Sequence, residues 1–457
     1  MTILTSTPYA DLEIGQEASV TRLCRAEDLY VFANASGNLN PMHLPEMDGD
    51  GDGMPEAIAP SAWVAALISG VLGNQLPGPG TLYLSQNLTF LGRAEAGSSL
   101  VAHVRVTEKL PDGVVRLATW VTGPDGVLAE GEARVIAPDA ARTFDASDVP
   151  GLTVQSHVHF DALLARAAPL PPLPTAVVCP ESADALNGAM LARDHTLIAP
   201  LFVGSAARIA EAAAEAGADI SGIEIIDVPD QRAAGLRAVA LIHEGRAAAL
   251  MKGHMHTDQL LHAILKKDGG LRTNRRLSHV FVMDVPGLDH LLFVTDAAIN
   301  IAPDLDAKVS ITQNAIDLAR ALGVAQPKAG ILSAVETVTP SIPSTLDAAI
   351  LSKMADRGQI TGGLVDGPLA MDNAVDLDAA RTKGLTGLVA GHADILVVPN
   401  LEAGNMIAKE LTFLAHAEAA GIGMGAQVPV ILNSRADDDK ARLASCAVAA
   451  LYADSLR

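Results

Sequence analysis

The stretch from Ser434 to Asp439 places a hydroxyl, a guanidinium and several carboxylates directly after the apolar run 428–432. This pattern predicts a strand that runs into a helix, and in open α/β sheets ligands bind at such junctions. Arg435 could grip a phosphate through two parallel hydrogen bonds, and a nearby carboxylate such as Asp437 could accept a proton. The spacing of Ser434 and Asp437 also matches a capping box. The stretch alone therefore predicts either a helix cap or transfer chemistry on an anionic substrate.

Three more segments carry candidate polar residues, and two of them lie where a predicted strand ends. In Val365–Asp372 a Gly-Pro pair predicts a turn between two aspartates, which an Asx turn would explain equally well. In Val398–Met406 a strand runs into a helix start, where free N–H groups can bind an anion. In Met251–Asp258 a lysine beside a glycine is a candidate phosphate contact. The candidate substrate-binding residues are Lys252, Thr257, Asp366, Gly367, Pro368, Glu402, Gly404 and Asn405.

Two other patterns have residue types found in metal or cofactor sites. His254 and His256 could ligate a metal ion, but no third ligand is apparent, so we expect no metal. The glycines of 421–425 resemble a dinucleotide-binding fingerprint, but they precede a predicted strand instead of following one. We therefore expect the chain to need no cofactor.

Composition restricts the class of protein. The 457 residues suffice for two or three domains, and 49% hydrophobic against 19% charged residues predicts sizeable cores. A net charge of −21 argues against a nucleic-acid partner but allows an anionic small substrate in a local positive pocket. Three scattered cysteines disfavour disulfides and a zinc site, and they favour a cytoplasmic location. We expect no signal peptide, because residues 1–12 lack a basic-then-apolar pattern, and no membrane association, because no apolar run is long enough to span a bilayer.

The first third of the chain has the pattern of an α+β domain. From about residue 80 to 137, alternating apolar and polar residues separated by turn signals predict an antiparallel meander. The helix predicted over 61–72 is apolar on all sides, as buried helices are. We assign residues 1–150 to this domain and the proline-rich range 151–174 to a linker.

Residues 175–457 alternate short apolar strands with longer helical patterns, which predicts a doubly wound α/β domain with a mostly parallel sheet. The length of this region could accommodate two subdomains with a cleft between them. Predicted helices include 311–322 and 345–357, and the predicted strands are 176–179, 198–204, 223–227, 279–284, 290–295, 328–332, 395–399 and 428–432.

The same region resembles the phosphate acetyl/butyryltransferase family through ordered segments along most of its length. These segments are Met251–Gly253, Arg276–Val280, Thr295–Ala298, Pro327–Lys328, Ser333–Glu336, Val365–Leu369, Leu401–Asn405 and Ser434–Asp437, the last in a form closer to the butyryl branch. The resemblance implies a two-subdomain phosphotransacylase fold of the isocitrate-dehydrogenase-like type. It also implies a reversible reaction in which acyl-CoA and inorganic phosphate give acyl phosphate and CoA, with no cofactor beyond these substrates.

The resemblance further implies roles for the C-terminal residues. Arg435 would hold the phosphoryl group and Ser434 would hydrogen-bond the reacting centre. An aspartate would accept the CoA thiol proton in the acyl-phosphate-to-CoA direction. The acceptor is one of Asp437, Asp438 and Asp439, with Asp437 the first choice and Asp439 an alternative, since the acid of acetyl-type members lies further into the helix. His262 stands where a basic residue is expected. Positioning would provide most of the catalysis, without an acyl-enzyme.

Residues 10–137 resemble MaoC-like hot dog domains, whose hydratase motif is Ser-Gly-Asp-x-Asn-Pro-x-His. In that family the aspartate and the histidine activate water for addition to a trans-2-enoyl-CoA. This chain keeps His43 but has Asn38 in place of the aspartate, and asparagine cannot act as a carboxylate base. Ser61 replaces a glycine that helps to bind the thioester oxygen. The resemblance implies a degenerate hydratase domain that binds acyl-CoA or mediates association.

Three other functions remain open from the sequence. The chain could be a bifunctional (R)-specific enoyl-CoA hydratase and phosphate acyltransferase, a nicotinamide-dependent decarboxylating dehydrogenase, or a non-enzymatic acyl-CoA-binding protein. The dehydrogenase is disfavoured, because the glycines of 421–425 do not stand where a dinucleotide-binding fingerprint would. Both resemblances imply a homodimer or a higher homo-oligomer.

Overall fold

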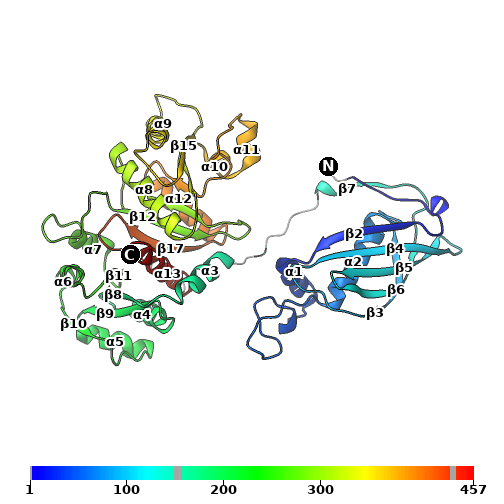
Figure 1. The fold of residues 1–457 in the computed structure, drawn as a ribbon, viewed down its shortest axis with the longest axis horizontal. Helices are drawn as coiled ribbons and strands as arrows, with labels where there is room; N and C mark the ends of the chain where they lie inside the picture. Colours follow the sequence, from blue (N-terminus) through cyan, green and yellow to red (C-terminus); the bar gives the residue numbers. More distant parts are fainter. Residues whose placement is uncertain (1–2, 149–153, 155–156, 433–438) are drawn as a thin grey trace. The chain divides into compact units, whose positions relative to one another are not determined.

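The chain folds into two compact units in a computed structural model that describes residues 3–148, 154, 157–432 and 439–457 (Figure 1). The first unit spans Met1–Val154 and the second spans Gln155–Arg457. Within these described ranges, every helix is too short or too polar to cross a membrane.

The first unit is an antiparallel sheet packed against one long helix. Its five main strands have the order β2-β4-β5-β6-β3, and β4, β5 and β6 form the predicted meander. Helix α2 buries Ile68 and Val71 against sheet residues such as Leu100 and Val104. The predicted α+β arrangement is therefore present, but the helix is buried along one face and not on all sides, since Ala62 and Ala66 are exposed. The bounds are β1 Ile3–Thr5, β2 Glu17–Leu23, β3 Leu82–Phe90, β4 Ser99–Lys109, β5 Val114–Gly123, β6 Gly126–Ile136, β7 Thr143–Asp145, α1 Ala26–Ser36 and α2 Ser61–Asn74, with 3-10 turns at Tyr9–Asp11, Pro41–His43 and Ala146–Asp148.

The second unit is built on one sheet with the strand order β10-β9-β8-β11-β18-β17-β12-β13-β16-β14-β15. Seven neighbouring pairs are parallel, and three pairs around β17 and β12 are antiparallel. The sheet is thus mostly parallel, as predicted. The bounds are β8 Leu173–Val178, β9 Ile198–Gly204, β10 Ile225–Asp227, β11 Ala249–Lys252, β12 Ser278–Asp284, β13 Leu292–Thr295, β14 Lys328–Leu332, β15 Leu364–Leu369, β16 Ile395–Val397, β17 Glu418–Met424 and β18 Val430–Ile431.

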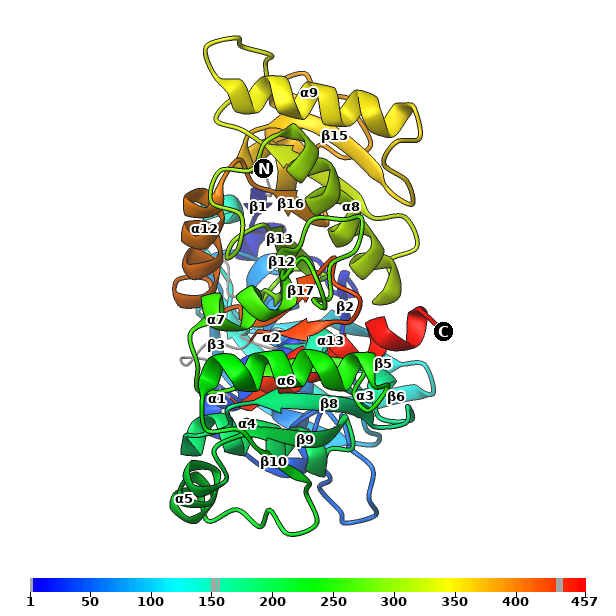
Figure 2. The same cartoon turned by 90° about the vertical axis from the view of Figure 1, so that its left-hand side faces the viewer.

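Helices cover both faces of this sheet, as a doubly wound fold requires. Successive strand residues point to opposite faces, so Val177 packs with α4 and α13 while Ala176 and Val178 pack with α6 and α7. Figure 2 shows α6 in front of β8 and β9, with α13 behind them. The bounds are α3 Val158–Ala167, α4 Ala183–Asp194, α5 Ala206–Ala216, α6 Gln231–His243, α7 Thr257–Ile264, α8 Leu305–Ala321, α9 Pro343–Asp356, α10 Met371–Val375, α11 Leu377–Thr382, α12 Leu401–Phe413 and α13 Asp439–Ser455.

The expectation of a linker over 151–174 requires correction, because α3 and the start of β8 lie inside this range. The cause is an apolar helix face: Phe160 and Leu163 are buried in the main core of the second unit. The predicted turn at Gly367-Pro368 is also wrong, since β15 runs through both residues. Strand β15 lies at the sheet edge, where a proline leaves no ladder hydrogen bond unmade. The glycine-rich range 421–425 is largely strand β17 itself.

Candidate active site

The loop between β11 and α7 is held by backbone contacts with the end of β8. A Cβ at Gly253 would lie 2.4 Å from the Cys179 carbonyl oxygen, so only glycine can occupy this position. The Gly253 N–H donates to Val178 O at 2.8 Å, and the His254 N–H donates to Cys179 O at 2.6 Å. Lys252 ends β11, and Thr257 begins α7. The loop therefore fixes two predicted substrate-binding residues on either side of a rigid turn.

Strand β18 ends at the same edge of the sheet as β11. It pairs in parallel with β11, with Ile431 opposite Met251. The next residues on the two strands, Leu432 and Lys252, therefore emerge at the same edge of the sheet. Ser434, Arg435 and Asp437 follow Leu432 and lie outside the described residues. Asp439 begins α13, and its exposed carboxylate lies 3.9 Å from the Arg442 guanidinium.

The other predicted substrate-binding residues lie in or after strands that run in the opposite direction. Strand β13 is antiparallel to β12, and β16, β14 and β15 run parallel to β13. In the strand register, Thr295 lies on the same transverse row as Met251. The two residues are separated by four strand spacings, or about 19 Å. The residues at 366–368 and 402–405 thus belong to a second group, which the structure positions separately from Lys252 and Thr257.

The turn after β13 organises this second group. Buried Asp296 accepts N–H hydrogen bonds from Ala298 at 2.9 Å and from Ile299 at 3.0 Å, and it accepts from Asn300 Nδ2 at 2.6 Å. Asn300 Oδ1 accepts from Arg276 Nε at 2.9 Å. The segments around residues 276 and 296, which are far apart in the sequence, are therefore joined by one polar chain.

Gly404 and Asn405 pack α12 against this turn. A Cβ at Gly404 would lie 2.9 Å from the Asp296 carbonyl oxygen, so a larger residue would push the helix away. Asn405 Nδ2 donates to Ala297 O at 3.4 Å, and Glu402 is exposed. The predicted anion site at the start of α12 has one of its N–H groups occupied, because Asn400 Oδ1 accepts from the Ala403 N–H at 2.9 Å.

The segment at 366–368 has mainly backbone contacts. Asp366 accepts the Gly367 N–H at 2.8 Å, and a Cβ at Gly367 would lie 2.8 Å from the Ile331 carbonyl oxygen. Gly367–Pro368 is a cis peptide bond. The nearby Lys383 ammonium lies 3.0 Å from Asp372 and 3.2 Å from Glu336. These contacts show how the segment is held.

His279 is a fully buried histidine close to the Asp296 turn. Burial lowers its pKa to about 4, and the attraction of Asp296 only partly offsets this effect. The imidazole is therefore neutral near pH 7, and it packs edge-on against Phe281 at 4.4 Å between ring centroids. Its position in the core makes His279 a structural residue of the sheet.

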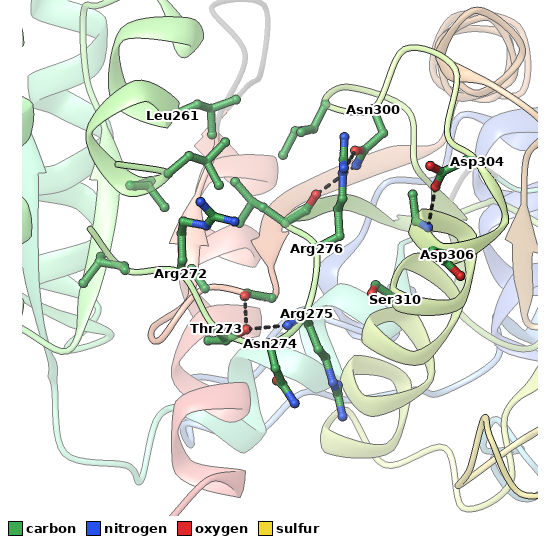
Figure 3. Close-up of a pocket in the computed structure, with 18 residues that line it drawn as sticks. Leu261, Arg272, Thr273, Asn274, Arg275, Arg276, Asn300, Asp304, Asp306 and Ser310 are labelled. Atoms are coloured by element: carbon green, nitrogen blue, oxygen red, sulfur yellow. Dashed lines mark hydrogen bonds between the residues drawn. The ribbon is translucent and has the colours of Figure 1, made fainter. Parts of the chain in front are cut away.

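A cavity of about 740 Å³ lies beside these segments, between α7, the start of α8 and the loop before β12 (Figure 3). Arg272, Arg275 and Arg276 line the cavity together with apolar residues such as Leu261 and Leu271. Sequence reasoning did not select Arg272 or Arg275. The signal that could have found them is the density of three arginines within five residues of a strongly acidic chain.

In the first unit, the hydratase-like residues lie in a locally bonded loop. His43 Nδ1 lies 2.8 Å from the Ile58 carbonyl oxygen, so Nδ1 carries the hydrogen that this oxygen accepts. Asn38 Oδ1 accepts the Asn40 N–H at 3.3 Å. Ser61 is exposed at the first turn of α2. The loop keeps an oriented histidine but has an amide at the position where the hydratase motif has a carboxylate.

A carboxylate cluster after this loop was not singled out from the sequence. Oxygens of Asp48, Asp50, Asp52 and Glu56 all lie within 4.8 Å of one another, as a cation site would need. Asp48 also accepts N–H hydrogen bonds from Gly53 and Gly51, which lower its pKa. These hydrogen bonds account for the shape of the loop, so the carboxylate cluster does not by itself indicate a bound ligand.

Known proteins match both units. The family model described as Phosphate acetyl/butaryl transferase matches residues 230–450. A phosphate acetyltransferase of Rhizobium meliloti is 59% identical over 294 residues, which cover 64% of this chain and 93% of the relative. A phosphate butyryltransferase of Clostridium beijerinckii is 43% identical over 65% of this chain and 98% of its own length.

Two solved structures are similar to parts of the chain. A crystal structure of a branched-chain phosphotransacylase from Enterococcus faecalis matches with a TM-score of 0.54 and 30% identity, over 61% of this chain and 98% of that chain. The R-hydratase PhaJ1 from Pseudomonas aeruginosa matches 34% of this chain and 99% of its own, with 36% identity and a TM-score of 0.32.

Proposed function

The chain belongs to the Phosphate acetyl/butaryl transferase family, and we propose that it exchanges an acyl group between CoA and inorganic phosphate. The observation that carries this proposal is the parallel register of β18 with β11, which brings the chain before Ser434 to the edge where Lys252 ends its strand. Lys252 and the predicted phosphate-binding residues that begin at Ser434 would then border the same space. The second unit is an acyltransferase in this proposal, and it needs no cofactor beyond its two substrates.

The proposed reaction is a direct transfer. A phosphate oxygen attacks the thioester carbonyl carbon, the carbon–sulfur bond breaks, and the CoA sulfur takes a proton from an aspartic acid. In the reverse direction that aspartate accepts the thiol proton. Arg435 would hold the phosphate, Ser434 would bond the reacting centre, and Asp437 would be the acid. Asp439 is less suited, because its carboxylate is exposed at a helix start, where the helix dipole favours it without any catalytic role.

The acyl group is proposed to be short. The acetyltransferase relative is more similar than the butyryltransferase relative, at 59% against 43% identity, whereas the Ser-Arg-Ala-Asp form resembles the butyryl branch. Acetyl and butyryl groups are therefore both candidates. Comparing kcat/KM for acetyl-, propionyl- and butyryl-CoA would rank them.

The deciding experiment is phosphate-dependent release of the CoA thiol by the purified full-length chain. We expect release from at least one of these three thioesters, and no release when phosphate is omitted. Absence of phosphate-dependent release from all three would show that the proposal is wrong.

For the first unit, we propose that hydratase activity is lost and that the unit binds acyl-CoA or supports a homodimer. The support is Asn38, whose side-chain amide cannot deprotonate water. It lies in a loop that still holds His43 through a hydrogen bond. The test is water addition to crotonyl-CoA. Ordinary turnover by the wild type that disappears in His43→Ala would instead establish a bifunctional hydratase and acyltransferase. Light scattering would measure the oligomeric state.

A further inference from the structure

Helix α13 begins with two cations that its own dipole disfavours. Lys440 and Arg442 lie in its first turn, close to Asp439. The amino end of a helix carries a partial positive charge, so it stabilises carboxylates and destabilises ammonium and guanidinium groups. The two cations therefore do not stabilise the helix start from within, and the reason for them must lie in their contacts with other elements.

Lys440 joins the helix start to α3 and β17. Its ammonium lies 3.1 Å from the Asp161 carboxylate of α3 and 4.0 Å from Glu418, the first residue of β17. The Glu418 side chain is only 15% exposed, so this contact is partly shielded from solvent. The other carboxylate oxygen of Glu418 lies 3.5 Å from His157 Nε2, just before α3. Helix α3, strand β17 and the first turn of α13 therefore meet in one charged cluster.

Arg442 connects the same turn to α4. Its Nη1 donates to the Asp184 carbonyl oxygen at 3.1 Å, and only 11% of its side chain is exposed. A Cβ at Gly188 would lie 3.0 Å from Arg442 Cδ, so the glycine leaves the space that the arginine fills. The first turn of α13 is thus held to α4 by Arg442 and to α3 by Lys440.

Helix α3 is a firm anchor for Lys440. The Phe160 N–H donates to the buried Asp284 carboxylate at 2.8 Å, which fixes the start of α3 on the end of β12. Phe160 belongs to the same buried core cluster as Ala444 and Val448 of α13. Figure 1 shows α3 next to α13. Asp161, the neighbour of Phe160, is therefore a fixed point to which the start of α13 is tied.

The residues predicted to carry out the transfer directly precede this turn in the sequence. Asp437, the proposed acid, stands two residues before Asp439 and three before Lys440. Because consecutive Cα atoms are about 3.8 Å apart, the place where α13 starts restricts the places that the Asp437 carboxylate can reach. An acid must lie within hydrogen-bond reach of the atom that takes its proton. A small displacement of the helix start would therefore lower the rate without weakening substrate binding.

We propose that Lys440 is a positioning residue for the transfer reaction. Through Asp161 and Glu418 it fixes the first turn of α13, and through this turn it fixes the carboxylate that exchanges the proton with the CoA sulfur. The proposal rests on the proposed function, since it concerns the acid of that reaction. It assigns no substrate contact to Lys440 itself.

The test compares Lys440→Gln with wild type in the full-length chain. The assay is phosphate-dependent thiol release from whichever of acetyl-, propionyl- and butyryl-CoA the wild type uses best. We expect kcat to fall about tenfold, while KM for the thioester and for phosphate stays within about twofold. Lys440→Arg, which keeps the charge, should recover most of the lost kcat. Ion pairs with exposed members contribute little to stability, so Tm should stay within about 2 °C of wild type.

Asp161→Asn removes the partner on α3 without a change in α13. Its kcat should fall about threefold, because Glu418 still contacts Lys440. The double variant with Lys440→Gln should lose no more than Lys440→Gln alone, since both changes break one contact. Amide hydrogen exchange in peptides that cover residues 439–443 should be faster than wild type in all three variants.

Lys353→Gln is the matched control, because it removes a lysine that is ion-paired with Asp356 at the end of α9. Its kcat should be that of wild type. Unchanged hydrogen exchange in Lys440→Gln would overturn the proposal, and so would a raised KM for phosphate, which would make Lys440 a substrate contact. Losses that multiply in the double variant would exclude Asp161 as the partner and would also overturn it. Absence of thiol release by wild type would refute the proposed function and this proposal together. Normal release by both wild type and Lys440→Gln would refute this proposal alone.

Discussion

The two units position their candidate side chains by different means. In the first unit, Asn38 and His43 lie in one loop, and their hydrogen bonds to Asn40 and Ile58 stay within one continuous stretch of the chain. In the second unit, the loop at Gly253 depends on β8, and the Asp296 turn depends on α12 and on Arg276. A local loop can keep its shape after losing a catalytic group, whereas a site built from distant segments depends on the packing of the whole unit.

The largest expected effect is on transfer chemistry in the second unit. Arg435→Ala should lower phosphate-dependent CoA release by at least about 1,000-fold, because a charged group aimed at the reacting phosphate is removed. The melting temperature should match wild type, and Arg357→Ala serves as a charge control. Residual activity within tenfold of wild type would remove Arg435 from the reaction.

A packing change should separate the stabilities of the two units. In Gly253→Ala, the new methyl group would overlap the Cys179 carbonyl oxygen, so the second unit should lose about 3 kcal/mol of unfolding free energy. Trp63 and Trp120, the only tryptophans, both lie in the first unit. Tryptophan fluorescence should therefore keep its urea midpoint while the circular dichroism midpoint falls. A fluorescence shift of the same size would mean that the units unfold together.

Acid should also act on the second unit through His279. Its pKa is about 4 in the folded state and 6.5 without burial, so the unfolded chain binds a proton first as the pH falls. Folding stability should therefore decrease between pH 6.5 and 4, by about 3 kcal/mol from this residue. His279→Gln should have a shallower decline in the circular dichroism midpoint. Identical pH slopes for the two proteins would contradict this assignment.

Restoring the missing carboxylate should sharpen the contrast in the first unit. Asn38→Asp should raise hydration of crotonyl-CoA by about 100-fold over wild type, since it supplies a general base next to an oriented histidine. The double change with His43→Ala should remove this gain. Acyl transfer to phosphate should be unaffected in both variants. No gain in crotonyl-CoA hydration would show that the hydratase-like site lacks a further catalytic group besides the carboxylate.

The smallest expected effect concerns helix α2. A Cβ at Gly70 would meet nothing within 4 Å, so Gly70→Ala should stabilise the first unit by about 0.5–1 kcal/mol through reduced backbone entropy of the unfolded chain. The tryptophan fluorescence midpoint should rise while thiol release stays constant. A lower midpoint would reveal a packing contact of α2 that the helix surface does not show.

Sequence reasoning recovered most of the fold because hydrophobic periodicity is local. The buried helix 61–72, the meander and eight strands of the second unit were all expected, and each has an element at its place. Strands β11 and β17 were missed, because lysine and glycine obscure their patterns, and the strand end expected near Asp366 did not include Gly367 and Pro368, which β15 contains. Helix α3 was missed because the prolines after Ala167 suggested a linker.

The sequence by itself determined the family, the two-unit organisation and the loss of the hydratase carboxylate, since residue identity and order suffice for these. Only the tertiary structure decided which candidates are neighbours. The register of β18 on β11 brings the chain before Ser434 to Lys252, and the opposite direction of β13 places the residues at 366 and 402–405 in a separate group. It also brought Arg272 and Arg276 to an apolar wall of α7. Strand direction and register arise from long-range pairing and packing, which local periodicity does not encode.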